Sequence, residues 1–257
     1  MSHDLVRRRT ELKYLLPAEQ TRRARAILTG EPPQGFRRIG GWVTTVYFDL
    51  PDRRLARAAM EHPEENLKLR LREYFDDEGA PCSRFVWIEI KERKGSASRK
   101  SRFLLHKRLV DGFLRGECDL ASVLTCQTSG SDVSDVCETV QRIHELGDGW
   151  TPFGAVRYRR CSIEGGTPVG RLTLDDRISY HLGPLTLYDS HESLDRSALG
   201  PVAGEEASGV MEAKHGGESL PEWCRRLVGS REPAEYSKFL LLSRLSTAPF
   251  PVNHYVD

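Results

Sequence analysis

The chain has 257 residues and a formal net charge of +1, so it can form one large β domain or two small ones and is not a generally basic nucleic-acid-binding protein. Its six cysteines are scattered without a Cys-x-x-Cys pair or a zinc-binding spacing, which predicts free thiols in a reducing compartment. The N-terminus lacks the apolar core of a signal peptide and no apolar run could cross a bilayer, so we expect a cytoplasmic protein without a transmembrane segment.

Strand-like segments dominate the first half of the chain. They are rich in β-branched and aromatic residues, or they alternate apolar with charged residues. We expect strands over residues 5–15, 42–50, 66–75, 84–94 and 100–106. A helix is expected between Pro17 and Gly30, because proline favours the first helical turn and glycine the position after the last one. A short helix is expected over 53–60.

The second half mixes helices with strands. The pattern is helical from 111 to 147, and its apolar stripe is assigned to the core: Val133, Val136, Val140, Ile143 and Leu146. Strands are expected over 153–163, 169–180 and 208–215, with an extra strand at 184–189 and a polar loop over 191–207. A short helix ending at Gly229 and a last helix over 233–246 close the chain. No linker separates these elements, so a single domain over residues 1–257 is favoured.

Charged residues occur at every second position in several of these strands. Lys68, Arg70 and Arg72 alternate with leucines. The same spacing relates Glu11 to Lys13, Glu89 to Lys91, Arg171 to Asp175 through Thr173, and Glu212 to Lys214. Residues i and i+2 of a strand point to the same side of the sheet. One charged face is normally solvated, but several mostly cationic faces favour a closed sheet with a charged interior, a tunnel for a polyanion.

Such a tunnel would suit phosphate chemistry. Lys and Arg supply fixed donors for phosphate oxygens, and a few carboxylates among them can hold Mg²⁺ or Mn²⁺. Phosphoryl transfer needs alignment and charge stabilisation more than covalent chemistry. The chain has neither a GxxxxGK[ST] loop nor a glycine-rich dinucleotide fingerprint, which disfavours a P-loop enzyme.

Nine short segments follow one another in an order that is similar to a known family. They are RRTELKYLLP (8–17), TTVYFDLPD (44–52), KLRLREY (68–74), WIEIKERKG (87–95), RKSRFLL (99–105), VRYRRC (156–161), RLTLDDRISY (171–180), VMEAKHGG (210–217) and EYSKFLL (235–241). The ordered set resembles the VTC domain, the polyphosphate polymerase branch of the triphosphate tunnel metalloenzymes.

The resemblance implies an α+β fold, an antiparallel eight-stranded β-tunnel with helices packed outside. It implies ATP as phosphoryl donor, a growing polyphosphate chain as acceptor, and Mn²⁺ or Mg²⁺ as cofactor. Fungal relatives work beside membrane subunits, so a membrane protein partner is also implied.

Site residues follow from the match to these motifs. The catalytic cations are Lys13, Arg70, Arg72, Lys91, Arg160, Arg171, Lys214 and Lys238. Further phosphate contacts are assigned to Lys68, Lys100, Tyr158 and Ser237. Tyr158 and Arg160 share a strand face, so Arg159 would point outward. Glu212 is expected as the principal metal ligand, and Glu11 and Glu89 as further ones.

Some alternatives stay open. Glu89 either binds metal or neutralises Lys91 and Arg93, and Asp175 can pair with tunnel arginines. The hydrolytic branch carries ExExK on its first strand, whereas this chain has Arg9 at the first glutamate position. That departure favours the polymerase over a tripolyphosphatase or nucleoside triphosphatase. A non-catalytic module that binds polyphosphate or inositol polyphosphates is the remaining alternative.

Overall fold

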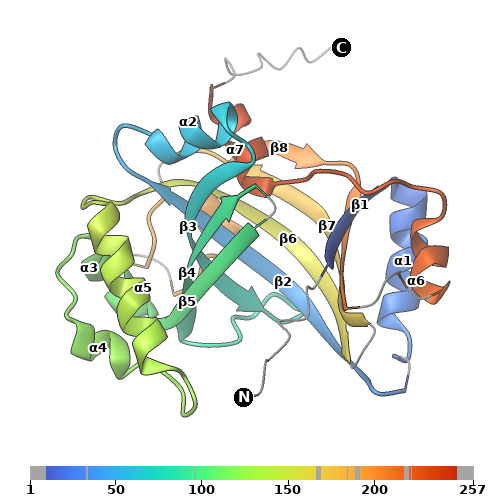
Figure 1. Cartoon of the computed structure of the whole chain (residues 1–257), viewed down its shortest axis with the longest axis horizontal. Helices are drawn as coiled ribbons and strands as arrows, with labels where there is room; N and C mark the ends of the chain where they lie inside the picture. Colours follow the sequence, from blue (N-terminus) through green and yellow to red (C-terminus); the bar gives the residue numbers. More distant parts are fainter. Residues whose placement is uncertain are drawn as a thin grey trace, which may run out of the picture.

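A computed structural model describes residues 10–32, 34–95, 97–165, 169–183, 185–188, 192–216, 220 and 222–247. Within these residues, nine strands form one antiparallel, strongly curved sheet with helices on its outer side (Figure 1). The strands are β1 (Thr10–Leu16), β2 (Phe36–Asp49), β3 (Glu65–Phe75), β4 (Phe85–Lys94), β5 (Ala97–His106), β6 (Thr151–Gly165), β7 (Val169–His181), β8 (Val202–Glu206) and β9 (Gly209–His215).

Most of the described helices lie in two groups, one at each end of the sheet (Figure 1). The described helices are α1 (Ala18–Thr29), α2 (Arg54–Glu61), α3 (Val110–Leu114), α4 (Leu120–Leu124), α5 (Val133–Leu146), α6 (Glu222–Val228) and α7 (Lys238–Thr247), with short 3-10 turns η1 (Lys107–Leu109) and η2 (Ser197–Leu199). In Figure 1, α3, α4 and α5 lie beside β5 at one end of the sheet, and α1 and α6 lie beside β1 at the other. None of the helices in the described part of the chain is long and apolar enough to cross a bilayer.

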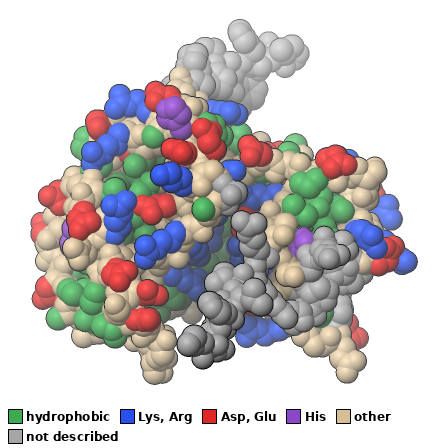
Figure 2. Space-filling model, in the orientation of Figure 1, with side chains coloured by type: hydrophobic (Ala, Val, Ile, Leu, Met, Phe, Trp, Pro, Cys, Tyr) green, Lys and Arg blue, Asp and Glu red, His purple; other side chains and the backbone are tan. Residues whose placement is uncertain are grey.

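The order of the strands is β1-β9-β7-β6-β2-β3-β4-β5, with β8 attached to β7. This confirms the predicted antiparallel sheet with outer helices. It differs from the prediction in having nine strands and an open ladder, because β1 and β5 are edge strands that do not pair with each other. The curvature still encloses a hollow, and Figure 2 shows Lys and Arg side chains gathered in it at the middle of the visible face.

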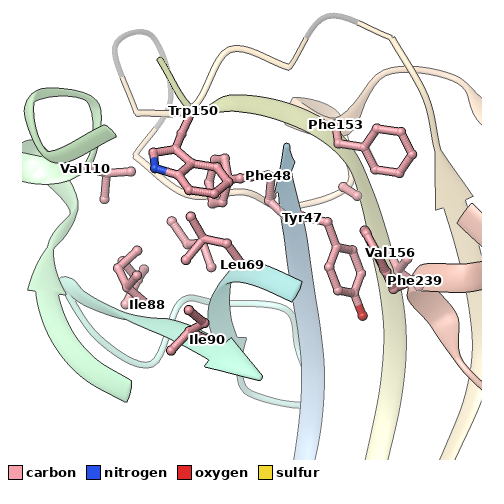
Figure 3. Close-up of a cluster of buried hydrophobic side chains, with 14 of the residues drawn as sticks. Tyr47, Phe48, Leu69, Ile88, Ile90, Val110, Trp150, Phe153, Val156 and Phe239 are labelled. Carbon is pink, nitrogen blue, oxygen red and sulfur yellow. The ribbon is translucent and has the colours of Figure 1, made fainter. Parts of the chain in front are cut away.

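The outer face of the sheet is apolar because it lies against helices. Leu69, Ile88 and Ile90 alternate with the charged positions of β3 and β4 and are buried. Figure 3 shows them gathered with Phe48 and Trp150 in the larger core cluster. The two-residue period therefore separates an apolar outer face from a charged inner one.

The helices at the two ends of the sheet pack on different core clusters, with α5 on the larger one. Beneath α1 and α6, Leu28 and Leu227 pack with Leu172 of β7 in a second apolar cluster. On α5, the predicted stripe is buried at Val136, Val140 and Ile143. Val133 is 55% exposed, contrary to prediction, because it is the first residue of the helix and extends past the edge of the core.

Several boundaries differ from the sequence prediction. Residues 185–188 form no strand, and the expected loop over 191–207 contains η2 and the short strand β8. The first strand is described only from Thr10, so residues 5–9 of the predicted strand lie outside the described residues. The last helix begins at Lys238 rather than at 233, because residues 231–237 are held extended across the sheet by the contacts described below.

Candidate functional site

Backbone pairing brings the charged positions of neighbouring strands side by side on the inner face. Lys68 of β3 is opposite Lys91 of β4, which is opposite Lys100 of β5. One step further along, Arg70 is opposite Glu89. The strands β3, β4 and β5 thus form one wall of the hollow. The opposite wall is formed by β1, β9, β7 and β6, with the pairs Lys13–Glu212, Glu11–Lys214, Arg171–Lys214 and Arg160–Asp175. The structure thus brings the predicted strand residues to one shared interior.

Glu89 is the centre of a cation cluster. Its carboxylate is fully buried and accepts a hydrogen bond from Nε of Arg70 at 2.8 Å. Three more cations lie within 4 Å: Lys100 at 2.5 Å, Arg72 at 3.6 Å and Arg102 at 3.7 Å. Burial alone would raise the pKa of Glu89, but Arg72, Arg70 and Lys100 outweigh it and hold the pKa well below its usual range. Glu89 therefore pairs with these four cations, rather than with Lys91 and Arg93, and balances only one of their charges.

Asp175 forms a second cluster on the opposite wall. Both of its oxygens accept hydrogen bonds from Arg160, at 2.7 and 2.8 Å, and Oδ2 also accepts one from Nζ of Lys238 at 2.7 Å. Both cations lie over the ring of Tyr158, with Arg160 at 5.2 Å and Lys238 at 4.6 Å from its centre. Arg159 points away to Asp77 on the outer side, as the alternation predicted.

Glu11 and Glu212 share one lysine. Nζ of Lys214 lies 3.1 Å from Glu11 and 3.3 Å from Glu212. Burial raises the pKa of Glu11, but Lys214, Lys91 and Lys13 outweigh it and lower the pKa to about 2. Burial raises the pKa of Glu212, but Lys214, Arg160 and Lys13 together outweigh it and lower the pKa. Lys13 of β1 and Lys68 of β3 bond to the adjacent residues Tyr236 and Ser237, so the two walls face each other across the hollow.

The carboxylates can be tested as metal ligands. Residues in the described ranges contain no group of three or more His, Cys, Asp or Glu side chains able to hold a metal by themselves. Mg²⁺ usually takes one or two protein carboxylates and completes its shell with water and phosphate oxygens. The Glu11–Glu212 pair fits that pattern. Glu89 fits it poorly, since it is fully buried and has four cations of described residues within 4 Å, whereas Glu11 has two and Glu212 has one.

Two lysines have no carboxylate of a described residue within 4 Å. In the part of the chain that the structure describes, neither Lys68 nor Lys91 forms an ion pair, although each is surrounded by other cations. Burial, followed by the charges of Lys91, Lys13 and Arg70, lowers the pKa of Lys68 to about 7. Burial also lowers the pKa of Lys91. The interior is therefore short of negative charge around these two ammonium groups.

Four arginines have a buried side-chain nitrogen without a hydrogen bond to a described residue, and two of them, Arg72 and Arg171, lie on the inner face. The Nε atoms of Arg72 and Arg171 are buried and make no hydrogen bond to any described residue. Arg171 has one carboxylate nearby, Glu164 at 3.7 Å. Buried donors are normally satisfied, so these atoms indicate where an absent acceptor would lie.

A strap, defined as residues 234–238, crosses the hollow from β1 to β3. The backbone N–H of Ala234 bonds to the carbonyl of Lys13 on β1 at 2.8 Å, and Nζ of Lys13 donates to the carbonyl of Tyr236 at 3.0 Å. On β3, Nζ of Lys68 donates to the hydroxyl of Ser237 at 3.0 Å. Ser237 also accepts from the backbone of Leu240 and so caps α7. The strap thus brings Ser237 and Lys238 to the charged interior.

Two residues of the interior are not among the predicted site residues. Arg102 lies 4.1 Å over the ring of Trp87 and reaches Glu89. Its position two residues after Lys100 was the signal for it. Tyr236, whose hydroxyl lies 2.8 Å from that of Tyr180, has no such signal because it lies outside any strand. Arg9, the residue that departs from the hydrolytic pattern, lies outside the described residues.

The comparisons with known proteins agree with this architecture. Vacuolar transporter chaperone complex subunit 4 of Schizosaccharomyces pombe is 24% identical over 241 residues, which cover 83% of this chain and 33% of that protein. The chain therefore spans about a third of the length of this curated relative.

Two solved structures are similar in fold. The putative adenylyl cyclase HpAC1 from Hippeastrum, described as having a dominant triphosphatase activity, has a TM-score of 0.53 at 17% identity and covers 94% of this chain and 98% of its own. A putative adenylate cyclase from Bacillus halodurans has a TM-score of 0.47 at 16% identity, covering 88% and 92%. The Hippeastrum likeness confirms the predicted triphosphate tunnel fold. The family described as the VTC domain matches residues 8–241, so the resemblance is confirmed and the chain belongs to the VTC domain family.

Proposed function

We propose that this chain is a metal-dependent polyphosphate polymerase that transfers the γ-phosphate of ATP to a growing polyphosphate chain inside its cationic tunnel. The observation that carries the proposal is the unbalanced charge of the interior. Lys68 and Lys91 have no carboxylate partner among the described residues, and Arg72 and Arg171 have buried donors without acceptors. A chain of phosphates would supply the missing negative charges and acceptors together.

The two walls would divide the work. The β3–β4–β5 wall, with Arg70, Arg72, Lys91 and Lys100, offers a continuous row of donors to several phosphates. The opposite wall would hold the reacting phosphates with Lys13, Arg160, Arg171, Lys214 and Lys238. Tyr158 lies beneath two of these cations, and Ser237 and Lys68 meet at the strap.

Glu212 and Glu11 would hold the metal ion, Mg²⁺ or Mn²⁺. When bound, the ion would neutralise charge on the phosphate oxygens of the donor. The protein groups around it hold the two substrates in line. The terminal phosphate oxygen of the polymer then bonds to the γ-phosphorus as the bond to the bridging β,γ-oxygen breaks, and ADP leaves. Arginines and lysines on both walls stabilise the charge that is shared in this transfer.

A triphosphatase is the second candidate, because the Hippeastrum protein of the same fold is described as having that activity. The two differ in the nucleophile. A hydrolase must orient a water molecule, whereas a polymerase must hold an anionic phosphate end close to ATP. The cationic walls and Arg9 at the hydrolytic glutamate position favour the phosphate nucleophile.

The curated relative is named as a subunit of a complex, so we extend the proposal to protein partners, including a membrane protein. We also propose that residues 1–257 act as a single domain.

The decisive experiment incubates the purified chain with ATP and Mn²⁺ and follows ADP, orthophosphate and polymer on a gel. We expect ADP release in step with polymer, and added short polyphosphate should shorten any lag by acting as primer. Orthophosphate without polymer across metals and pH values would replace the proposal with the triphosphatase. Tight polyphosphate binding without consumption of ATP would replace it with a binding module.

A further inference from the structure

Asp175 is a negative charge in an interior proposed to bind polyanions, so its presence needs a reason. Its side chain is 5% exposed, and it lies on the inner face opposite Arg160. Burial raises its pKa, but Arg160 and Lys238 outweigh burial and hold the pKa well below the usual range. The carboxylate is therefore ionised and would repel a nearby phosphate unless it does something else there.

The contacts of Asp175 differ from those of the other buried interior carboxylate. Glu89 joins cations of adjacent strands, which backbone pairing already places together. Asp175 joins β6, through Arg160, to the first residue of α7, Lys238. Sheet pairing places Arg160 opposite Asp175, whereas Lys238 is the last residue of the strap. Because Lys238 is the first residue of α7, its bond to Asp175 also positions the start of α7 next to the tunnel.

The geometry points to a positioning role: we propose that Asp175 holds the ammonium of Lys238 and the guanidinium of Arg160 side by side, so that both face one phosphate group. Lys and Arg side chains are flexible, and each would otherwise sample many rotamers. Arg160 donates to both oxygens of Asp175, and Lys238 donates to Oδ2 as well. Both cations also lie over the face of the Tyr158 ring. The identity of the phosphate ligand rests on the proposed function, whereas the arrangement of the three side chains does not.

Asp175→Asn tests this role, and Asp176→Asn is the matched control. Asp176 is the next residue, faces outward, and pairs with Arg25 at a similar level of burial. Both variants remove one buried carboxylate charge, which has two cationic partners at Asp175 and one at Asp176, so both should lower Tm. Measurements on the full chain would compare kcat, KM for ATP, the Kd of tripolyphosphate, and Tm.

We expect Asp175→Asn to lower kcat on the order of 10²-fold, since misplacement of a reacting group by about 1 Å has that effect. The Kd of tripolyphosphate should stay within about threefold or tighten, because a negative charge has left the tunnel. Asp176→Asn should leave kcat within about twofold. A kcat within about twofold of wild type for Asp175→Asn, or parallel losses of kcat and affinity in both variants, would overturn the role.

A structure of the wild-type chain with tripolyphosphate gives a second test, which stands even if Asp175→Asn does not fold. Positioning requires Asp175 to stay hydrogen-bonded to both cations while both contact the same phosphate. Departure of either cation from Asp175 would refute the role. If the wild type consumes no ATP, the proposed function fails, and this bound structure still decides the role of Asp175.

Discussion

Binding of a phosphate chain should bring protons into the tunnel, and Lys68 should account for most of them. In the free protein, burial and the neighbouring cations lower the pKa of Lys68 to about 7, so at pH 8 only about a tenth of its amines carry a proton. A bound phosphate next to the ammonium supplies the absent counter-charge and restores the pKa toward its ordinary value near 10.4. Lys68 should then take up roughly 0.9 proton per tripolyphosphate at pH 8, and almost none at pH 6.

The sign of the pH dependence follows from this uptake. The bound state holds more protons than the free state between the free and bound pKa values of Lys68. Affinity for tripolyphosphate should therefore fall as pH rises above about 7, with Lys68 alone contributing up to about tenfold per pH unit. Below pH 7 the contribution of Lys68 to affinity is complete and no longer depends on pH. Lys100, whose pKa is lowered to about 8 mainly by burial, adds uptake of the same sign.

Calorimetric titrations in buffers of different ionisation enthalpy measure the proton count directly. Tripolyphosphate itself exchanges protons on binding, so the informative quantity is the difference between the wild type and Lys68→Arg. Arginine keeps the positive charge but does not titrate in this range. We expect Lys68→Arg to take up roughly 0.9 proton fewer at pH 8, with no difference at pH 6. Equal proton counts at pH 8 would refute the reasoning, because Lys68 would then be charged before the ligand arrives.

Three further changes test other parts of the site. Glu212→Gln should lower metal-dependent turnover by at least 10–100-fold without lowering Tm, since it removes a proposed metal ligand; unchanged turnover at limiting Mn²⁺ would contradict that assignment. Arg160→Ala should weaken tripolyphosphate binding by more than about tenfold, whereas Arg159→Ala, which alters the outer face of the same strand, should leave the Kd within about twofold; equal losses measured by calorimetry would argue against the inner-face assignment. Gly41→Ala should prevent stable folding, because Gly41 has a φ of +136° and an added Cβ would lie 2.0 Å from the carbonyl oxygen of Phe75; a thermal melt like that of wild type would show that the backbone can move aside.

The inner face of the sheet could be predicted from the sequence because alternation is a local property. Lys68, Arg70 and Arg72 must share a side once β3 is a strand, and the same holds for Glu89 with Lys91. The order of the motifs then identified the family, and the match over residues 8–241 confirms it. A two-residue period predicts to which side of the sheet each side chain points. That was sufficient to place the candidate residues of all the strands in one interior.

Partners and closure could not be predicted in this way, because they depend on residues far apart in the chain. Glu89 is neutralised by cations of β3 and β5, and this choice follows from register rather than from its neighbours in sequence. The strand β8, with the sequence VAGEE, lacks alternation and contains a glycine, so it resembled a loop. The extended strap over 234–238 has no periodic signal of its own.

Three lysines of the tunnel hold the strap in place and are also proposed to bind phosphate. If β1 and β5 were paired, backbone hydrogen bonds would close the sheet and the side chains would be free for the ligand. The sheet stays open, and the strap crosses the hollow, held by Lys13 at the Tyr236 carbonyl, Lys68 at Ser237 and Lys238 at Asp175. These three lysines are also proposed phosphate contacts. Each has further donors, since an ammonium group has three N–H bonds and uses only part of them on the strap. A bound phosphate chain can therefore share these lysines with the strap. The same lysines then bind the phosphate chain and hold the strap across the hollow.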